Sequence, residues 1–326
     1  MIATTGFFDG VHCGHRLVIE RLVSMARERG DESLVVTFWP HPRAVLQNGA
    51  RELRLLTTLE EKKALLASLG VDRVEVLDFT RSFAALTAEQ FLRDILQAQF
   101  GVTTLLMGYD NRLGSDRLTA NSLRSIAEAM GIELIEVEMW SKGAHTPKPS
   151  SKMTPPIASD GPLPLMRPRV ATGFGACAPS DLAISSTKIR KSLEEGKVEE
   201  ANGMLGYGYS LTGVVVAGNR LGRTIGFPTA NMRLYEPLKL VPGRGVYVVE
   251  VQVLGRTWRG MTNIGLRPTV GGTFTTIETH ILDFDEDIYG LPLTITFLRR
   301  LRDEVHFPSL DALKAQLTLD KEACRA

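Results

Sequence analysis

The sequence predicts two domains of different class: an α/β domain with a parallel sheet, followed by a small antiparallel β-barrel. Strand-like and helix-like segments alternate over residues 1–139, which is typical of a parallel sheet covered by helices on both faces. Residues 140–181 are rich in Pro, Ser and Gly and show no sustained period, so we interpret them as an insertion or linker. From Tyr207 onwards, β-branched and aromatic residues form short segments separated by Gly, Pro and Asn, which favours a barrel.

The elements of the first domain follow from apolar periodicity and from capping residues. A short apolar start at residues 1–5 leads through a glycine-rich turn into a helix that we expect over 16–29. Thr87 is expected to cap a helix that Gly101 ends, because glycine tolerates the left-handed backbone of a helix C-terminus. The same reasoning predicts strands at 34–39, 74–79, 103–107 and 132–138, and helices at 57–69, 87–100 and 121–130.

Two short helices should complete this domain beyond the linker, within residues 182–205. We expect Ser186 or Thr187 to cap the first of them, and Val198 to begin the second. The barrel domain is then expected over 207–322, with a terminal helix capped by Ser309. Its predicted strands are 211–217, 245–254, 257–264, 275–282 and 293–297.

Composition limits the classes of partner. A net charge of +1 over 326 residues provides no field that would gather nucleic acid, so any phosphate binding should be local. No apolar run approaches the roughly 18–20 residues that span a bilayer, and no secretion signal is recognisable, so we expect no membrane partner. The three cysteines are far apart and odd in number, which fits a reducing, cytoplasmic location. The oligomeric state is left open.

The stretch Gly6–His15 (GFFDGVHCGH) is the first candidate site. It lies between the first strand and the first helix, and it places His12 and His15 where that helix begins. Unpaired backbone N–H groups at a helix N-terminus favour a bound phosphate, and histidines there add donors to an anion whose charge rises during a reaction. The alternative is a pair of partly exposed loop histidines without a role. A metal site is disfavoured because zinc sites want more ligands.

A second candidate is the run Ser185-Ser186-Thr187, with Arg190 one turn later. Hydroxyl groups, a helix N-terminus and a guanidinium together suit the β- or γ-phosphate of a nucleotide and a leaving pyrophosphate. Seen alone, the same run is also typical of an ordinary capped helix.

Seven motifs in order make the chain resemble one family, the bacterial bifunctional riboflavin kinase/FAD synthetases. The resemblance covers the chain apart from residues of about 140–181. It implies a Rossmann-like nucleotidyltransferase domain and a riboflavin kinase barrel. The motifs are Gly6–His15, Thr37–Pro42, Gly108–Gly114, Ile184–Arg190, Gly222–Asn231, Gly260–Thr269 and Thr276–His280.

The resemblance implies that the first domain transfers AMP from ATP to FMN, giving FAD and pyrophosphate. FMN phosphate attacks the α-phosphorus directly, so the protein has to position the substrates and stabilise charge. The roles implied are phosphate stabilisation by His12 and His15, binding of the β/γ-phosphates by Ser186, Thr187 and Arg190, and shaping of the nucleotide pocket by Gly6, Phe8 and Asp9. His41 and Asp110 are candidates for the flavin side.

The second domain, by the same resemblance, phosphorylates riboflavin to FMN with ATP. Phosphoryl transfer needs Mg²⁺, a phosphate cradle and a base near the attacking hydroxyl. The cradle would come from Gly218, Gly222 and Gly226, Mg²⁺ ligands from Thr229 and Asn231, and the base from Glu278. Arg302 and Phe307 are candidates for the riboflavin side.

Two alternatives stay open at this point. The insertion 140–181 separates Ser186 and Arg190 from the histidine motif, so a chain with kinase activity and a degenerate adenylyltransferase domain is one alternative. A non-catalytic flavin-binding regulator is the other, although the intact His12, His15 and Glu278 disfavour it.

Overall fold

The computed structural model describes residues 1–46, 53–108, 111–137, 184–218, 221–269 and 272–325. The predicted linker 140–181 and the candidate Asp110 lie outside these residues. By their contacts the residues form two compact units. The first, which we call the sheet unit, comprises Met1–Gly6, Arg16–Phe38 and Leu69–Arg169; the second, the barrel unit, comprises Phe7–His15, Trp39–Ser68 and Val170–Ala326.

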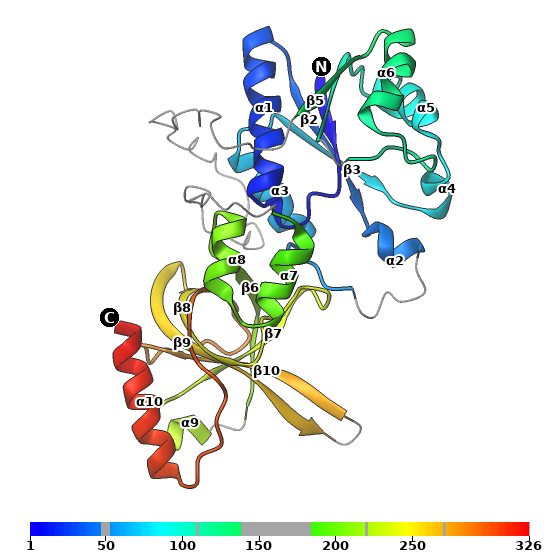
Figure 1. Cartoon of the computed structure of the whole chain (residues 1–326). Coiled ribbons are helices and arrows are strands. Elements are labelled where there is room, and N and C mark those ends of the chain that lie inside the picture. The colour runs from blue at the N-terminus through cyan, green and yellow to red at the C-terminus, as the bar shows by residue number, and fades with distance from the viewer. Residues whose placement is uncertain (47–52, 109–110, 138–183, 219–220, 270–271, 326) are drawn as a thin grey trace. The chain divides into compact units, whose positions relative to one another are not determined.

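The sheet unit contains the predicted parallel sheet, which confirms the α/β class. Its five strands lie in the order β3-β2-β1-β4-β5 (Figure 1). β1 pairs in parallel with β2 and with β4, and β4 pairs in parallel with β5. The strands are β1 Ile2–Thr5, β2 Ser33–Trp39, β3 Arg73–Asp78, β4 Thr104–Gly108 and β5 Glu133–Val137, close to the predicted bounds.

Helices lie on both sides of this sheet, α1 on one side and α5 and α6 on the other (Figure 1). Thr87 forms the predicted cap: its hydroxyl accepts from Gln90 N, while the Gln90 side chain accepts from Thr87 N. The helix predicted over 87–100 is less regular than expected, because a π-helical segment follows its first turn. The helices are α1 Cys13–Arg29, α4 Arg81–Ala84, α5 Ala88–Gln90, the π segment η3 Phe91–Gln97 and α6 Ala120–Ala129.

The barrel unit contains a closed antiparallel barrel, as predicted, with the strand order β10-β7-β6-β11-β8-β9. The sequence did not indicate β7, whose residues Ala-Asn-Met-Arg-Leu have little β-propensity; pairing with β6 and β10 closes the barrel there. The strands are β6 Ser210–Val216, β7 Ala230–Leu234, β8 Gly245–Val253, β9 Arg256–Thr269, β10 Gly272–Ile281 and β11 Pro292–Arg302.

The helices of the barrel unit come before, between and after the barrel strands in sequence. The cap predicted for the first helix after the linker, α7, is wrong. Ser185 caps α7, since its hydroxyl accepts from Lys188 N at 3.3 Å, so neither Ser186 nor Thr187 is the cap. Ser309 caps the terminal helix as predicted, accepting from Ala312 N at 3.1 Å. The elements are η1 Asp9–Val11, α2 Pro42–Leu46, α3 Leu59–Ser68, α7 Ser186–Glu194, α8 Val198–Leu205, α9 Leu221–Thr224 and α10 Leu310–Arg325.

Within the barrel unit, a segment from the N-terminal half of the sequence pairs directly with the chain that follows β7. Leu55 forms a parallel bridge with Lys239. Leu55 N donates to Leu238 O at 2.8 Å, and Leu240 N donates to Leu55 O at 2.9 Å. The contacts therefore join residues 39–68 to the barrel, whereas the sequence predicted a first domain over 1–139; the predicted boundaries stay a prediction.

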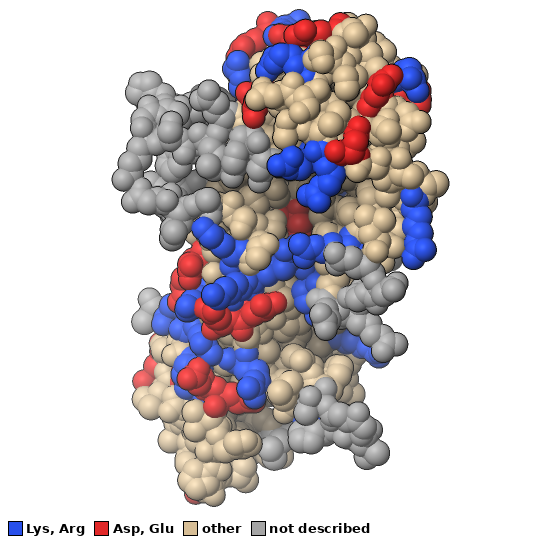
Figure 2. Space-filling model, turned by 45° about the vertical axis from the view of Figure 1, so that its right-hand side comes forward, with Lys and Arg blue, Asp and Glu red and all other residues tan. Residues whose placement is uncertain are grey.

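Charged side chains of both signs lie next to one another on the face of the molecule that Figure 2 shows. This intermixing agrees with the near-zero net charge of the sequence. Local arrangements of residues, rather than a broad field, must therefore supply any anion site on this face.

Phe297 provides a test of the barrel core. Its side chain is fully buried, and its ring lies perpendicular to Tyr247 with 5.3 Å between centroids. We expect Phe297→Ala to lower the free energy of unfolding by about 3–5 kcal/mol, through lost burial and the cavity left behind. Urea denaturation measures this. Phe274, which is 60% exposed on β10, is the matched control, and an equal loss in Phe274→Ala would contradict the assigned core.

Candidate active sites

The histidine loop, residues 7–15, has a strained backbone. Phe8 and Val11 have φ angles of 50° and 38°, in the left-handed region that only glycine adopts readily, and Gly10 has φ 81°. A Cβ on Gly10 would lie 2.9 Å from Leu56 Cδ1. A loop in this conformation persists only where surrounding contacts hold it.

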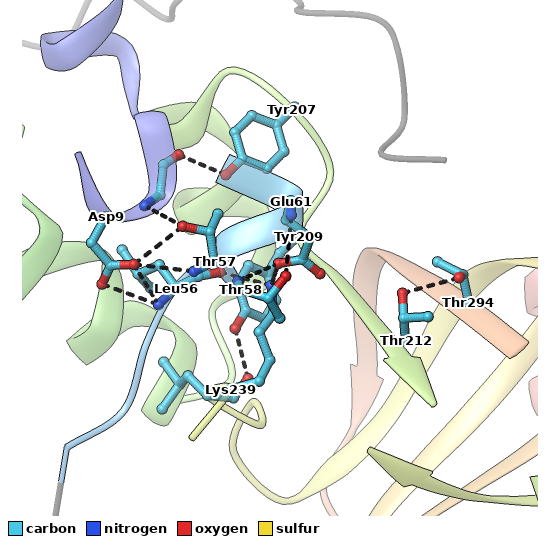
Figure 3. A network of polar contacts seen from close by, with 12 residues as sticks. Asp9, Leu56, Thr57, Thr58, Glu61, Tyr207, Tyr209, Thr212, Lys239 and Thr294 are labelled. Carbon is cyan, nitrogen blue, oxygen red and sulfur yellow. Dashed lines mark hydrogen bonds and ion pairs between the residues drawn. The ribbon is translucent and has the colours of Figure 1, made fainter. Parts of the chain in front are cut away.

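Asp9 supplies those contacts through a buried carboxylate. Its Oδ1 accepts from the backbone N–H groups of Leu56 at 3.0 Å and Thr57 at 3.1 Å (Figure 3). Its Oδ2 pairs with Arg190 Nη2 at 2.5 Å. Burial of a carboxylate is tolerated when it is paired and hydrogen-bonded in this way. Asp9 thus joins three segments that are far apart in the sequence.

Further hydrogen bonds connect helix α7 and the chain after α8 to the same loop. Ser186 Oγ donates to Asp9 O at 3.1 Å, and Arg190 Nε donates to Arg54 O at 2.8 Å. The Tyr207 hydroxyl donates to Gly10 O at 2.6 Å. The structure therefore brings together the predicted Asp9, Ser186 and Arg190. Thr187 lies exposed in the first turn of α7.

The rings of His12 and His15 are stacked, with 3.6 Å between centroids and 16° between planes. His12 Nδ1 accepts from the backbone N–H of His15 at 3.3 Å, so a neutral His12 carries its proton on Nε2. His15 Nδ1 is buried and has no hydrogen-bond partner among the residues that the structure describes. The pair therefore offers ring nitrogens that a ligand can engage.

Burial sets the protonation of these histidines. Desolvation lowers the pKa of His12 to about 4, although Asp9 opposes the shift, and it lowers the pKa of His15 well below the ordinary value of 6.5. Both rings are therefore neutral near pH 7. They can donate a hydrogen bond to a phosphate oxygen, but they add no positive charge.

Aromatic side chains surround the histidines. The Phe8 ring meets His15 edge to face at 5.3 Å, and the Phe7 ring meets His41 at 4.1 Å. His41 Nδ1 accepts from Arg43 N at 3.0 Å, and burial lowers the pKa of His41 to about 4. Within the sheet unit, Gly6 follows β1 and donates its N–H to Val36 O at 3.1 Å. His41 thus contacts Phe7 of the histidine loop, and its role on the flavin side stays a prediction.

A buried ion pair extends the network and was not foreseen from the sequence. Lys239 Nζ donates to Glu61 Oε2 at 2.5 Å and to Leu56 O at 2.7 Å (Figure 3). The ammonium also lies 4.7 Å from the centroid of the Tyr209 ring. Glu61 belongs to the run Glu60-Glu61-Lys62-Lys63, whose composition is typical of an exposed helix face. Only packing reveals that its two central residues are buried.

In the barrel, strand register brings the predicted kinase residues together. Glu278 on β10 lies directly opposite Asn231 on β7 and opposite Asn263 on β9. Arg267 Nη2 pairs with Glu278 Oε1 at 3.0 Å. The ion pair with Arg267 therefore orients the Glu278 carboxylate.

The predicted glycines lie where a side chain would collide. A Cβ on Gly218 would lie 2.2 Å from Asn231 Nδ2, and one on Gly222 would lie 2.2 Å from Phe227 O. The Gly222 position also lies 3.7 Å from Thr229 Cγ2, and Gly226 has φ +85°. Gly218 therefore leaves room for the Asn231 side chain, and Gly222 and Gly226 permit the turn that leads to Thr229.

His280 supports the turn before Thr229 through a hydrogen bond, whereas the sequence indicated only that it shares a strand face with Glu278. It lies on the same face of β10 as Glu278, two residues on. Its Nδ1–H donates to Pro228 O at 2.8 Å, and its ring lies 5.2 Å from that of Phe227. This bond anchors the turn just before Thr229.

Arg302 and Phe307, the predicted riboflavin-side residues, lie near each other, with 5.7 Å between Arg302 Cζ and the ring centroid. Arg302 also has a structural partner, because its Nη2 lies 2.7 Å from Oδ2 of the buried Asp320 on α10. This ion pair ties the terminal helix to β11. The flavin roles of both residues stay predictions.

Comparison with known proteins identifies two matching families. Residues 1–150 match the family described as FAD synthetase, and residues 205–326 match the family described as riboflavin kinase. The chain is 37% identical to the bifunctional riboflavin kinase/FMN adenylyltransferase of Listeria monocytogenes, over 100% of this chain and 91% of that protein. It is 34% identical to the protein of the same name from Escherichia coli K12, over 99% and 91% of the two chains.

A solved structure extends the likeness to the fold. The crystal structure named as a macrolide-efflux protein from Streptococcus pneumoniae is 31% identical, has a TM-score of 0.82, and matches 99% of this chain and 93% of that chain.

In the described part of the present chain, none of the helices combines the length and apolar composition that a membrane span requires. Among the same residues, no group of three or more His, Cys, Asp or Glu side chains could hold a metal ion.

The Lys239–Glu61 pair is a test of the polar network. We expect Lys239→Met to lower the free energy of unfolding by about 3–5 kcal/mol, because it leaves the Glu61 carboxylate buried without its cation. Urea denaturation measures this. The control is Lys197→Met, which removes an exposed ion pair with Glu195 and should change little. Equal effects of the two substitutions would contradict the assigned network.

The lowered pKa values of His12, His15 and His41 predict acid sensitivity. Below pH 6.5 these histidines become protonated in the unfolded chain, whereas in the folded chain they stay neutral down to a pH of about 4. The free energy of unfolding is therefore highest above pH 6.5 and decreases as the pH falls towards 4. The loss from His12 alone is on the order of 3 kcal/mol. Urea denaturation at pH 7.5 and 4.5 should show a smaller pH dependence in His12→Asn. The exposed His306→Asn should retain the full dependence, and equal behaviour of the two variants would refute the explanation.

Proposed function

Because the chain belongs to the family of bifunctional riboflavin kinase/FMN adenylyltransferases, it phosphorylates riboflavin to FMN and adenylylates FMN to FAD, and we propose which residues carry each reaction. The observation that supports the adenylyltransferase assignment is the Asp9 network. It draws Ser186 and Arg190 to the histidine loop, although 171 to 178 positions separate them from His12 and His15 in sequence. The barrel register supports the kinase assignment.

In adenylyl transfer, an oxygen of the FMN phosphate forms a bond to the α-phosphorus of ATP, and the bond from that phosphorus to the leaving pyrophosphate breaks. His12 and His15 would donate hydrogen bonds to the phosphate oxygens on which charge accumulates. Both rings are neutral, so they contribute through oriented donors. The positive charge must come from elsewhere in the site.

Arg190 supplies part of that charge while it also holds the loop. Its Nη2 pairs with Asp9, and its Nε donates to Arg54 O. A guanidinium has five N–H donors, so further donors are available to the β/γ-phosphates. The backbone N–H groups of the first turn of α7, with the hydroxyl of Thr187, would bind the same phosphates. Gly6, Phe8 and Asp9 would shape the nucleotide pocket, and His41 with Phe7 would form the flavin side.

In riboflavin phosphorylation, the 5′-hydroxyl oxygen of the ribityl chain bonds to the γ-phosphorus, ADP leaves, and Glu278 accepts the hydroxyl proton. Asn231 and Asn263 flank Glu278, and Arg267 orients its carboxylate. The backbone around Gly218, Gly222 and Gly226 would cradle the ATP phosphates, because no Cβ blocks their approach. Arg302 and Phe307 would close the riboflavin side.

The residues beside Glu278 fit Mg²⁺. Thr229 and Asn231 offer oxygen donors, which hard cations prefer, and the missing side chain of Gly218 leaves room for that of Asn231. These two residues would therefore hold the ion. When bound, it would offset the negative charge of the ATP phosphates. The cytoplasmic location and the lack of a nucleic-acid partner stay predictions from the sequence.

Two substitutions should separate the activities. We expect Glu278→Gln to lower FMN formation by about 10²–10⁴-fold, the usual contribution of a general base, while FAD formation from added FMN is retained. His15→Ala should lower FAD formation by about 10²–10³-fold and spare FMN formation, because it removes a donor to the transition state. Chromatography of reactions with riboflavin or FMN, ATP and Mg²⁺ measures both products.

The same assay separates the proposal from its rivals. Wild-type protein that forms FMN but no FAD would support a kinase with a degenerate adenylyltransferase domain. Flavin binding without turnover of ATP would support a regulator. Equal loss of both products in either variant would contradict the division of residues between the two sites.

A further inference from the structure

Lys62 is a fully buried lysine beside the histidine loop. It follows Glu61 on α3, and successive residues of a helix point about 100° apart, so the two buried charges face different surroundings. Glu61 faces Lys239. Lys62 places its ammonium over the Phe7 ring, 3.6 Å from the centroid. Lys63, the next residue, is exposed and pairs with Glu60 at 3.4 Å.

The charged and titratable groups around Lys62 are those of the proposed adenylyltransferase site. From the histidine loop, the Asp9 carboxylate raises the pKa of Lys62. Lys62 in turn lowers the pKa values of His15 and of His41, which Arg190 and Arg43 also influence. Lys62 is therefore near both histidines, from a third element of the barrel unit. Since Asp9 already pairs with Arg190, the ammonium of Lys62 is a second cation in the same surroundings.

We propose that Lys62 is a catalytic residue of adenylyl transfer, and that its ammonium binds a phosphate group of ATP or FMN beside His15. This inference rests on the proposed site. The neutral histidines add no positive charge and Arg190 shares its guanidinium with Asp9, so a further cation would help to offset the charge of the phosphates. The ammonium is a compact charge with three donors, which suits a phosphate oxygen. The bonds made and broken stay those of adenylyl transfer, and Lys62 keeps its proton throughout.

The charge of Lys62 lies at a buried position. Burial disfavours the charged form and lowers the pKa of Lys62 to about 8, with Asp9 opposing the shift. Groups whose pKa values are shifted by burial and by a charged neighbour are common in active sites.

Lys62→Met, Lys62→Arg and the adjacent control Lys63→Met, made in the full chain, test the proposal. For Lys62→Met we expect a fall of about 10²-fold in kcat/KM for FAD formation, with FMN formation unchanged. Lys63→Met should stay within about twofold of wild type in both activities. A rise in KM for ATP would place the phosphate on the nucleotide, and a rise in KM for FMN would place it on the flavin.

The pH profile gives a signature that a structural role would not produce. In wild type, kcat/KM for FAD formation should fall as the pH rises through about 8, because Lys62 loses its proton. Lys62→Arg should retain part of the activity and lose this alkaline limb, since a guanidinium stays charged. Burial lowers the pKa values of the nearby His15 and His41, so neither histidine accounts for an alkaline limb.

Two outcomes would overturn the proposal. In the first, Lys62→Met matches Lys63→Met in FAD formation. In the second, Lys62→Met unfolds at a lower temperature and loses both activities, which would make Lys62 a structural residue. Either result leaves the proposed function intact if wild type forms FAD and His15→Ala does not. Failure of wild type to form FAD would instead defeat the proposed function itself.

Discussion

The buried carboxylate of Asp9 is the interaction on which the histidine loop depends. Phe8 and Val11 hold left-handed backbone conformations that an isolated loop would not keep. Asp9 balances this strain with backbone donors from Leu56 and Thr57 and with the charge of Arg190. The low dielectric constant of the protein interior strengthens each of these bonds and makes the loss of any one of them costly. One cooperative arrangement therefore joins the loop, the segment before α3 and helix α7.

The same arrangement includes a second buried charge pair of the barrel unit. Leu56 gives its N–H to Asp9 and its carbonyl to Lys239, which also pairs with Glu61. The Tyr209 hydroxyl donates to Leu240 O beside it. The histidine loop, the segment before α3 and the chain between β7 and β8 are therefore joined by buried polar contacts within the barrel unit.

The residues proposed for the kinase reaction are brought together by the pairing register of neighbouring strands. A strand alternates its side chains with a period of two, and pairing register then fixes which residues meet across the barrel. Glu278, Asn231 and Asn263 meet in this way, and His280 anchors the adjacent turn. Local backbone geometry thus accounts for most of this site, whereas the other site depends on contacts between distant segments.

Sequence patterns by themselves determined the parallel sheet, the barrel, most helix bounds, and the motif residues from His12 to Glu278. Apolar periodicity, caps and turn glycines are local properties, so they can be read in order along the chain. Strand β7 was missed because it forms through pairing with β6 as the barrel closes, and not through local β-propensity. The Ser185 cap was missed because α7 begins one residue earlier than the sequence indicated. Only the tertiary structure decided that Glu61 and Lys62 are buried. Their run of charges is typical of a solvated surface, and nothing local shows that Lys239 and Phe7 face them.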